Sequence, residues 1–472
     1  MTVTVEELGQ LKYAEMKVSD FTIITGLNNS GKTYMTYALY GFLRFWQQGF
    51  MLPLDENDMK ALSLGKKIHI DLNNYLREAQ TIVDTACTEY QHQLHKLFAS
   101  RERLFEKATF RIALSGSDLR IDTEDFNRLI SSSGEATEGF SLVKSSNQDI
   151  LTVSFFSKNT DNVTPDIPIF VIKRFIGNAL KEILFKKVFP PVFISSAERT
   201  GIAFFEKELD FARKKLVDML RTTERSVDLF DIVKERSSDY PWPVDDNVEF
   251  VRRLDEISNK ESFLAKDYPS LIDSFETLVG GTYTMNQNQG VTFKSKGTGW
   301  HYTMGESASS VRSLLDLGFY LKHKAEQGDW LMIDEPEMNL HPSNQRKLAR
   351  LLAGLVNAGI KILITTHSDF VIRELHNLIL LNHRKDKPHI IKELTKENYT
   401  EQDLIQAKQL SIYVAEKDNI KGSGSRKSMK QTLISTQITD DQGIASTCFD
   451  DTITKLNRLE DTILYGEDYH DE

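Results

Sequence analysis

Cysteine and proline are scarce in this sequence, and long apolar runs are missing. The 472 residues include 11 prolines and two cysteines, Cys87 and Cys448. Two thiols so far apart form neither a disulfide framework nor a four-cysteine zinc site, and we expect them to be inert in a reducing compartment. The most apolar stretch, residues 348–366, contains Arg350 and Lys361. It is also shorter than the ~20 apolar residues of a membrane-spanning helix.

A targeting signal is also missing. The first residues, MTVTVEELGQ, carry two glutamates and no basic residue, unlike a secretory signal. We therefore expect a cytoplasmic protein with no membrane partner. Positive charge is in the minority, because 58 Lys and Arg face 68 Asp and Glu, for a net charge of −10. Bulk charge thus attracts neither nucleic acid nor anionic membrane. The hydrophobic share of 40% suits a large globular core.

Short β-branched and apolar segments indicate one α/β sheet. Residues 21–25 (FTIIT) predict a strand that ends in a glycine loop, and a helical pattern follows over about 33–48. Residues 330–333 (WLMI) and 361–366 (KILITT) are runs of the kind buried on both faces of a parallel sheet. A helix opened by proline is predicted between them, over about 342–356. A right-handed strand–helix–strand crossover is the expected connection.

Two insertions are predicted to interrupt this core. The expected segments are an N-terminal core part (1–50), a helical and β insertion (51–190), a core strand segment (191–204), a helical insertion (205–278), a C-terminal core part (279–385) and a C-terminal tail (386–472). Apolar residues at three- and four-residue steps over 72–97 predict one long amphipathic helix. Residues 280–304 alternate polar with apolar between glycines, which predicts hairpins. We expect one or two helices in the tail.

The glycine loop is the strongest functional signal. It is a complete G-x-x-x-x-G-K-[ST] motif between a predicted strand and a predicted helix. Its glycines let backbone N–H groups point at phosphate oxygens, and the helix N-terminus adds its dipole. Lys32 would reach the β- and γ-phosphates of ATP, and the Thr33 hydroxyl would bind Mg²⁺. The predicted nucleotide-binding residues of this loop are Gly26, Asn28, Asn29, Ser30, Gly31, Lys32 and Thr33.

An acidic pair and a histidine follow the two later strands. Asp334 stands where open α/β sheets bind ligands, and it would hold Mg²⁺. Glu335 would polarise the attacking water. The alternative is a helix N-terminus, where Asp, Glu and Pro are all favoured. The glycine loop favours a catalytic pair. His367 could bond the γ-phosphate and sense its loss, although a lone histidine is more often structural.

Together these motifs resemble the ATP-binding-cassette (ABC) class of P-loop ATPases, and within it the SMC-like branch. The matching pieces are GLNNSGKT (26–33), LMIDEPEMNLHP (331–342) and ITTHS (364–368). The first two look most like the prokaryotic overcoming-lysogenization-defect (OLD) ATPases. They are also similar to ATPase subunits of phage-defence systems such as PtuA of Septu and AriA of PARIS, and SAERTG (196–201) looks like that group too. The resemblance implies an α/β fold, an ABC-type ATPase head with a mostly parallel sheet, flanking helices and helical insertions.

The same resemblance implies a homodimer, or a higher oligomer, in which two protomers sandwich two ATP molecules. The family's signature turn, which caps the γ-phosphate bound by the other protomer, is best matched by Ser309 and Ser310. Val311 stands where the family has a glycine, and an ordinary serine N-cap is the alternative. Residues 337–342 would form a loop at the same interface. No glutamine suits the family's glutamine loop, and Arg199 is the substitute that the sequence offers.

Three classes of function follow. The first is an ATP-hydrolysing sensor or scaffold of an anti-phage complex that controls a separately encoded effector, expected to be a nuclease. This chain shows no nuclease site of its own. The second is an ATP-gated DNA-binding ATPase of repair or maintenance. Its DNA contacts could come from Lys181, Lys186 and Lys187 or from 213–215, although solvated helix faces explain these clusters equally well. The third, a transporter motor, is disfavoured by Val311 and the large insertions.

Overall fold

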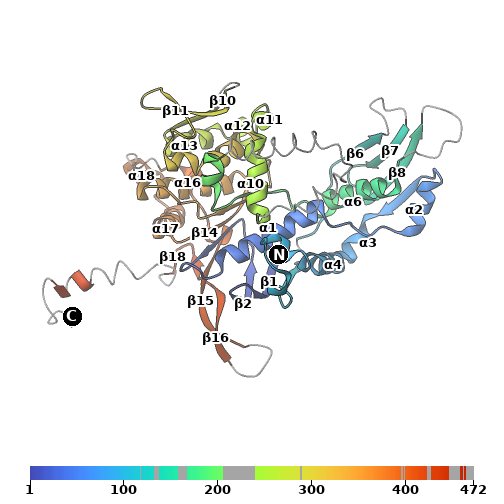
Figure 1. Cartoon of the computed structure of the whole chain (residues 1–472), viewed down its shortest axis with the longest axis horizontal. Helices are drawn as coiled ribbons and strands as arrows, with labels where there is room; N and C mark the ends of the chain where they lie inside the picture. The colour runs from blue at the N-terminus through green and yellow to red at the C-terminus, as the bar shows by residue number, and fades with distance from the viewer. Residues whose placement is uncertain are drawn as a thin grey trace, which may run out of the picture.

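The core of the protein is a mostly parallel sheet. The structure, a computed structural model, describes residues 1–116, 118–131, 138–157, 167–205, 240–286, 290–394, 397, 399–421, 427–445, 458–460 and 462–463. Within them, a six-stranded sheet has the order β16-β15-β3-β14-β13-β9 (Figure 1). Neighbouring strands are parallel except for β16, which pairs antiparallel with β15. Their bounds are β3 (Phe21–Thr25), β9 (Val192–Ser195), β13 (Trp330–Asp334), β14 (Lys361–Thr366), β15 (Leu410–Lys421) and β16 (Lys427–Ser435).

Helices cover both faces of this sheet. Helix α1 (Lys32–Gln48) lies on one face, and α16 (Pro342–Asn357) and α17 (Asp369–His383) lie on the other. Successive side chains of a strand point to opposite faces, so each central strand supplies both cores. Ile24, Met332 and Leu363 pack with α1, whereas Ile23, Ile333 and Ile364 pack with α16 and α17. This two-sided burial explains the continuous apolar runs in the sequence.

The predicted strand–helix–strand connection between parallel strands is confirmed. Strand β13 leads through α16 to β14, and the two strands pair in parallel. Helix α16 has Pro342 at its first position, and the His341 side chain accepts from the Ser343 N–H at its N-cap. Helix α17 follows β14 directly, and the Ser368 hydroxyl accepts from the Val371 N–H. Local capping chemistry of this kind is readable from sequence, which is why these boundaries were predictable.

A small antiparallel sheet joins the N-terminus to the core sheet. Its order is β2-β1-β5, with β1 (Thr2–Leu8), β2 (Leu11–Lys17) and β5 (Thr109–Ala113). The Tyr413 hydroxyl on β15 accepts from the Lys17 N–H at 2.8 Å and donates to the Lys17 carbonyl at 3.1 Å. The N-terminal sheet therefore meets the core sheet through the strand that lies beside β3.

Much of the first insertion lies at the right of Figure 1, and its apolar side chains share one core with α1. Its sheet has the order β4-β8-β7-β6. The elements are α2 (Glu56–Ser63), β4 (Ile68–Asp71), α3 (Leu72–Arg77), α4 (Ala79–Gln91), α5 (Leu94–Leu97), η1 (Glu102–Leu104), β6 (Phe126–Ser131), β7 (Glu138–Lys144), β8 (Ile150–Ser157) and α6 (Ile169–Phe185). The single long helix predicted over 72–97 is wrong, because the chain leaves the helix at Glu78 and again at His92 and Gln93. With these breaks, the apolar side chains of α4 and α5 pack against α1. The Tyr90 hydroxyl of α4 also donates to the Ala38 carbonyl of α1.

The second insertion and the segment after it cover the other face. The described helices there are α7 (Arg199–Phe204), α10 (Trp242–Arg252), α11 (Leu254–Ile257), α12 (Phe263–Asp267), α13 (Pro269–Val279), α14 (Ser309–Arg312), α15 (Leu315–Phe319) and η2 (Tyr320–Lys324). The hairpins predicted over 280–304 are confirmed as β10 (Gly281–Asn286), β11 (Gly290–Ser295) and β12 (His301–Thr303), which pair antiparallel. The basic cluster at 213–215 lies outside the described residues.

The predicted tail, 386–472, needs a correction. Strand β15 belongs to the core sheet and pairs in parallel with β3, from Leu410 opposite Phe21 to Val414 opposite Thr25. The described part of this segment also holds α18 (Lys387–Glu393), η4 (Glu401–Asp403), η5 (Ala407–Gln409), β17 (Ile438–Thr439) and β18 (Gly443–Ile444). One helix was expected correctly, but the two long strands were missed. The segment is therefore partly core and not only a tail.

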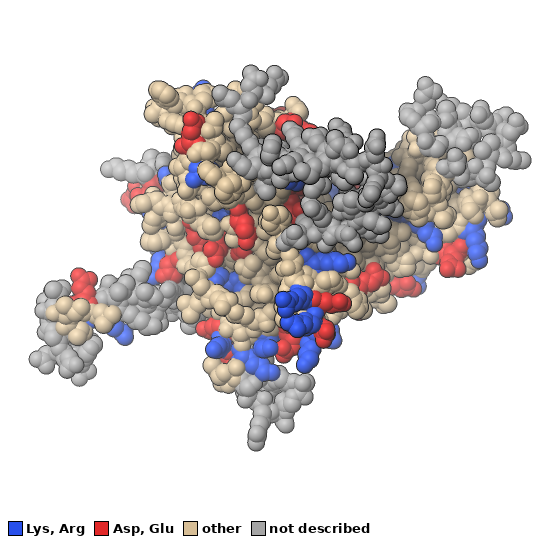
Figure 2. Space-filling view, viewed as in Figure 1, with Lys and Arg blue, Asp and Glu red and all other residues tan. Residues whose placement is uncertain are grey.

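One of the three lysines proposed as DNA contacts in the first insertion needs a correction, whereas Lys186 and Lys187 are exposed and their contact with DNA stays a prediction. Lys181 is buried, and its ammonium donates to the Trp46 carbonyl at 2.5 Å and to the Phe50 carbonyl at 2.6 Å. Burial lowers the pKa of Lys181 to about 8. This lysine holds α6 against α1 and cannot reach a nucleic acid. On the face seen in Figure 2, basic and acidic side chains are mixed.

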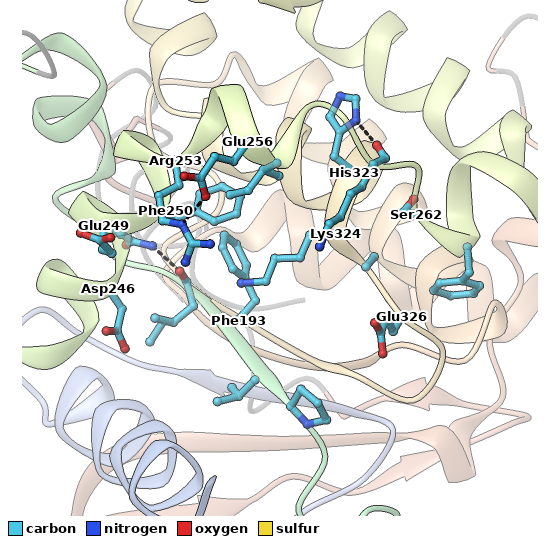
Figure 3. Close-up of a pocket in the computed structure, with 18 of the residues that line it drawn as sticks. Phe193, Asp246, Glu249, Phe250, Arg253, Glu256, Ser262, His323, Lys324 and Glu326 are labelled. Carbon is cyan, nitrogen blue, oxygen red and sulfur yellow. Dashed lines mark hydrogen bonds and ion pairs between the residues drawn. The ribbon is translucent and has the colours of Figure 1, made fainter. Parts of the chain in front are cut away.

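A cavity lies away from the strand ends that carry the motifs. It has a volume of about 940 Å³ and is lined by β9, α10 and η2, among other segments (Figure 3). Lys324 lies there 5.5 Å from the centre of the Phe193 ring and 5.2 Å from that of Phe250. Acidic and basic side chains line this cavity together, so its charge selects no class of ligand. In the described part of the chain, no helix has the length and hydropathy needed to cross a bilayer.

Candidate nucleotide site

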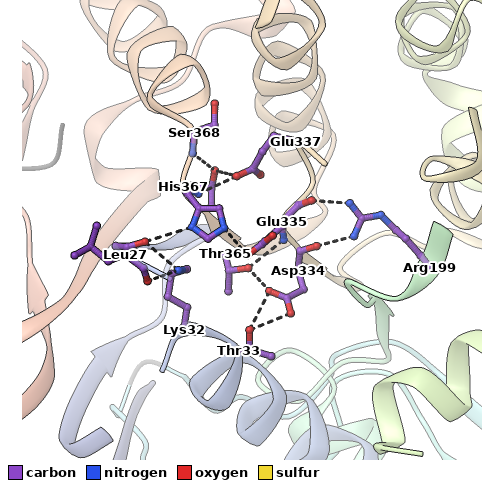
Figure 4. Close-up of polar contacts among 12 residues, drawn as sticks. Leu27, Lys32, Thr33, Arg199, Asp334, Glu335, Glu337, Thr365, His367 and Ser368 are labelled. Atoms are coloured by element: carbon purple, nitrogen blue, oxygen red, sulfur yellow. Dashed lines mark hydrogen bonds and ion pairs between the residues drawn. The ribbon is translucent and has the colours of Figure 1, made fainter. Parts of the chain in front are cut away.

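The predicted site residues of three strands meet at one edge of the core sheet (Figure 4). The glycine loop follows β3, Asp334 and Glu335 come at the end of β13, and His367 follows β14. These strands are adjacent and parallel, so their carboxyl ends coincide, which is where ligands bind in open α/β sheets. The topology thus brings together residues that lie more than three hundred positions apart, such as Thr33 and Asp334.

The glycine loop has a backbone that suits close packing. Gly26 and Gly31 have φ angles of 135° and 96°, and Asn29 has 60°, the left-handed region that glycine and asparagine tolerate best. A Cβ on Gly26 would lie 2.7 Å from the Ala415 carbonyl oxygen of β15. Outside the loop, the Gln10 amide donates to the Asn29 side chain at 2.6 Å. Asn28 and Asn29 are exposed.

Ser30 and Lys32 are buried side chains of the loop that could each bond a phosphate. The Ser30 hydroxyl is buried without a hydrogen-bond partner in the described structure. Lys32 is 5% exposed, and its ammonium donates to the Gly26 and Leu27 carbonyls at 2.9 and 2.8 Å. Burial lowers the pKa of Lys32, and the nearby carboxylates of Glu335, Asp334 and Glu337 oppose this. A phosphate would satisfy the serine and neutralise the lysine, so the loop fits ATP.

Thr33 and Asp334 converge as a candidate Mg²⁺ site. The Thr33 hydroxyl lies 3.2 Å from one Asp334 carboxylate oxygen and 3.4 Å from the other, and the Thr365 hydroxyl also donates to this carboxylate. Burial raises the pKa of Asp334, which a cation would reverse. Among the described residues, no three His, Cys, Asp or Glu gather as metal ligands. One carboxylate and one hydroxyl suit Mg²⁺, which takes its other ligands from phosphates and water.

Glu335 has an unusual backbone conformation. Its φ is 52°, which costs a non-glycine residue on the order of 1 kcal/mol or more. Its N–H donates to the Thr365 carbonyl at 3.2 Å and to the Thr365 hydroxyl at 3.1 Å. The turn aims the carboxylate at His367, whose Nε2 lies 2.5 Å from Oε1. Strain of this kind, held by surrounding bonds, is typical of functional positions.

The hydrogen bond between Glu335 and His367 shifts both groups toward their charged forms. It is the largest cause that lowers the pKa of Glu335, and the largest that raises the pKa of His367. Partial burial opposes both shifts. On its other side, His367 Nδ1 lies 3.4 Å from the Gly26 carbonyl oxygen. The histidine therefore bridges the glycine loop and the acidic pair.

Glu337 was expected in an interface loop, but it turns inward. It is 9% exposed, and its Oε1 accepts from the Thr366 hydroxyl at 2.7 Å and from the His367 N–H at 2.8 Å. Its Oε2 is buried without a hydrogen-bond partner in the described structure. Glu337 therefore fixes the backbone of His367. The second glutamate of the Glu-Pro-Glu sequence was the available signal, but only the fold shows which strand it contacts.

Ser309 and Ser310 are not brought to this cluster. They begin α14; Ser309 is exposed, and its hydroxyl accepts from Arg312 at 3.3 Å. No hydrogen bond in the described part of the chain joins either serine to the glycine loop. The guanidinium of Arg312 also donates to the Met304 carbonyl at 3.2 Å and to the Ser307 carbonyl. The turn before α14 is thus held from within its own segment.

Arg199 does not fit the place of a metal-contacting glutamine. It is 3% exposed, and its guanidinium donates to four main-chain carbonyls. These belong to Ser313 at 2.8 Å, Ser196 at 2.9 Å, Asp334 at 2.6 Å and Glu335 at 2.6 Å. Figure 4 shows it on the far side of the acidic pair from Leu27. Its position just after β9 was predictable from the sequence, but these acceptors were not.

A glycine loop, an acidic pair and a histidine at the carboxyl ends of three parallel strands are the arrangement of a P-loop ATPase. A sequence profile of the AAA ATPase domain matches residues 1–372. The chain therefore belongs to the AAA ATPase domain family. The match ends within α17, so β15 and β16 lie beyond it. No curated protein matches the sequence.

A comparison with solved structures finds SMC heads at low similarity. An SMC head bound to the C-winged helix domain of ScpA has 8% identity over 92% of this chain and 97% of that chain, with a TM-score of 0.33. An SMC head with an extended coiled coil, bound to the C-terminal domain of ScpA from Pyrococcus furiosus, has 9% identity over 97% and 98%, with a TM-score of 0.31. The SMC head domain from Thermotoga maritima has 10% identity over 93% and 98%, with a TM-score of 0.27.

Proposed function

We propose that this protein binds and hydrolyses ATP as the sensor or scaffold subunit of an anti-phage defence complex, in which it controls a separately encoded effector. The observation that carries the ATPase part is the cluster in which Thr33 meets Asp334 and His367 meets Glu335. The defence part is supported by the resemblance of GLNNSGKT and LMIDEPEMNLHP to OLD-like ATPases.

In this proposal different residues of the site bind the triphosphate, hold Mg²⁺ and activate the attacking water. The loop from Gly26 to Thr33 binds the triphosphate through its N–H groups, and Lys32 exchanges its two carbonyl partners for phosphate oxygens. Thr33 and Asp334 would hold Mg²⁺, which when bound supplies positive charge to the phosphates. Glu335 orients and deprotonates the attacking water. His367 donates to the γ-phosphate, which releases Glu335 to act on the water.

Two copies of the chain would close over two nucleotides. Ser309 and Ser310 stand at an exposed helix start, where they can donate to a phosphate held by the partner. The difference between the ATP-bound and ADP-bound states lies in contacts to the γ-phosphate, so closure acts as a switch. The effector, expected to be a nuclease, would respond to the closed dimer.

The test is a pull-down of tagged Glu335→Gln from host cells with ATP and Mg²⁺. This substitution keeps the shape of the side chain and removes the base, so the closed dimer should accumulate. Lys32→Ala is the control that cannot close. A stoichiometric protein partner that needs ATP and is lost in Lys32→Ala supports the proposal. DNA alone, lost in the same control and at high salt, would instead favour an ATP-gated DNA-maintenance ATPase. Recovery of neither would refute the effector-coupled role.

A further inference from the structure

One buried arginine donates to four main-chain carbonyls behind the catalytic turn. Arg199 begins α7, and its guanidinium donates to Ser196, which follows β9, and to Ser313, which ends α14. It also donates to both residues of the acidic pair, through the carbonyls of Asp334 and Glu335. A guanidinium has five N–H donors in a rigid plane, and these contacts use all three of its nitrogens.

The two carbonyls at the acidic pair flank the strained residue. Glu335 has a φ of 52°, and its N–H is held by Thr365 on the side of β14. Its carbonyl is held by Arg199 on the opposite side of the turn, at 2.6 Å. Thr365 and Arg199 thus fix the two ends of the same residue. Removing either would let the turn relax toward ordinary φ values and move the carboxylate away from the place of the attacking water.

The third contact reaches the element that would act on the other nucleotide. The Ser313 carbonyl accepts from Arg199 at 2.8 Å, and Ser313 is the C-cap residue of the short helix that Ser309 begins, with its N–H bonded to the Ser309 carbonyl. The Ser313 hydroxyl lies 3.4 Å from the Met338 carbonyl, just beyond the acidic pair. A shift of the Glu335 turn is therefore transmitted through one side chain to the end of α14, one helical turn from Ser309.

We propose that Arg199 is a positioning residue that holds Glu335 in its catalytic conformation and couples it to the Ser309–Ser310 turn of the same protomer. This rests on the proposed function, because that turn would complete the site of the partner copy. In the closed dimer each Arg199 then links the base of one ATP site to the γ-phosphate donors of the other. The two sites hydrolyse ATP cooperatively for this reason.

The test compares Arg199→Lys with a matched buried arginine. Lysine keeps the charge but offers a single nitrogen, which cannot bond all four carbonyls. Arg350 is 7% exposed and its guanidinium donates to the Glu397 carbonyl, away from the nucleotide, so Arg350→Lys reports the general cost of such a change. ATP affinity, kcat, KM, the Hill coefficient and Tm are measured for both variants in the full-length protein.

The expected result is specific to catalysis. Arg199→Lys should lower kcat by roughly 10-fold or more, with little change in ATP affinity, as for an interaction that acts mainly in the transition state. Its Hill coefficient should fall toward one. Arg350→Lys should lower Tm but leave kcat and the Hill coefficient unchanged. Equal kcat and Hill coefficient in Arg199→Lys and the wild type would overturn the proposal, as would losses that Arg350→Lys reproduces.

A second variant covers the case in which Arg199→Lys does not fold. Arg199→Ala leaves a space shaped for a guanidinium, and millimolar guanidinium ion should restore part of kcat while an equal concentration of ammonium does not. Absence of rescue in a folded, ATP-binding Arg199→Ala protein would also refute the assignment. If instead Glu335→Gln hydrolyses ATP like the wild type, the proposed function itself fails, and that outcome is independent of Arg199.

Discussion

The carboxylate of Glu335 and the imidazole of His367 form an ion pair, with Oε1 and Nε2 2.5 Å apart. In this pair, His367 contacts the carboxylate that is predicted to act as the base. The pair also keeps the histidine protonated above its ordinary range, because the bond raises the pKa of His367. We infer that binding of a γ-phosphate exchanges one partner of His367 for another. The same histidine then reports the state of the nucleotide.

The first prediction concerns the pH dependence of stability. The pKa of His367 is raised by the fold, so its stabilisation is fully present below its unfolded value of 6.5 and is lost as pH rises through the folded value. The pKa of Glu335 is lowered, so its part is present above 4.5 and is lost as pH falls through the folded value. The pair therefore stabilises most between about pH 4.5 and 6.5. His367→Gln should lower Tm relative to the wild type at about pH 5.5, and less at about pH 8.5.

A pH-independent difference in Tm would contradict this assignment. Glu335→Gln should remove most of the same pH dependence, because either substitution breaks the pair. The double variant should then differ little from either single one, since residues in contact are not additive. These measurements need only thermal unfolding in the absence of nucleotide.

The second prediction separates binding from stability at Lys32. This lysine is buried and bonded to neutral carbonyls, so its charge is costly until phosphate arrives. Lys32→Met should abolish ATP binding and leave the Tm of the nucleotide-free protein equal or higher. Lys181→Met is the matched control, because Lys181 is also buried and donates to two carbonyls, far from the site. It should retain ATP binding, measured by titration calorimetry. Loss of binding in both variants would show a general packing defect.

The predictable part of the fold has local signals. Strands β3 and β14 and helix α16 were predicted to within one or two residues, because capping residues and apolar runs bound them. The acidic pair and the glycine loop were predictable for the same reason. The breaks within 72–97 contain no proline or glycine. They depend on packing against α1, which the sequence does not display.

The unpredictable part depends on long-range pairing. Strand β15 lies beside β3, at the opposite end of the chain, and nothing in LSIYVAEKDNIK specifies that neighbour. Its register is fixed by contacts such as Tyr413 with Lys17. The role of Arg199 was hidden for a similar reason, because its acceptors are main-chain carbonyls. Every residue has a main-chain carbonyl, so the residue type does not reveal which carbonyls accept these bonds.

The third prediction links β15 to the nucleotide. Gly26 has a φ of 135°, and a Cβ there would lie 2.7 Å from the Ala415 carbonyl oxygen. Gly26→Ala should therefore displace the loop or β15, with a loss of stability of about 1–3 kcal/mol and a loss of ATP binding. Gly297→Ala is the control, because Gly297 has no positive φ and open space around its Cβ. It should change stability by no more than about 0.5 kcal/mol. Equal stability of the two variants in urea would contradict the contact.

The fourth prediction tests Glu337 as the support of His367. Glu337→Gln keeps an acceptor for the Thr366 hydroxyl and the His367 N–H and removes a charge whose second oxygen lacks a partner in the described structure. Its stability in urea and its kcat should stay close to those of the wild type. Glu337→Ala leaves both donors unpaired, which costs about 1–3 kcal/mol for each buried group, and it should lower kcat because His367 loses its fixed position. If Glu337→Gln instead loses activity as fully as Glu335→Gln, Glu337 takes part in the chemistry itself and its charge is required.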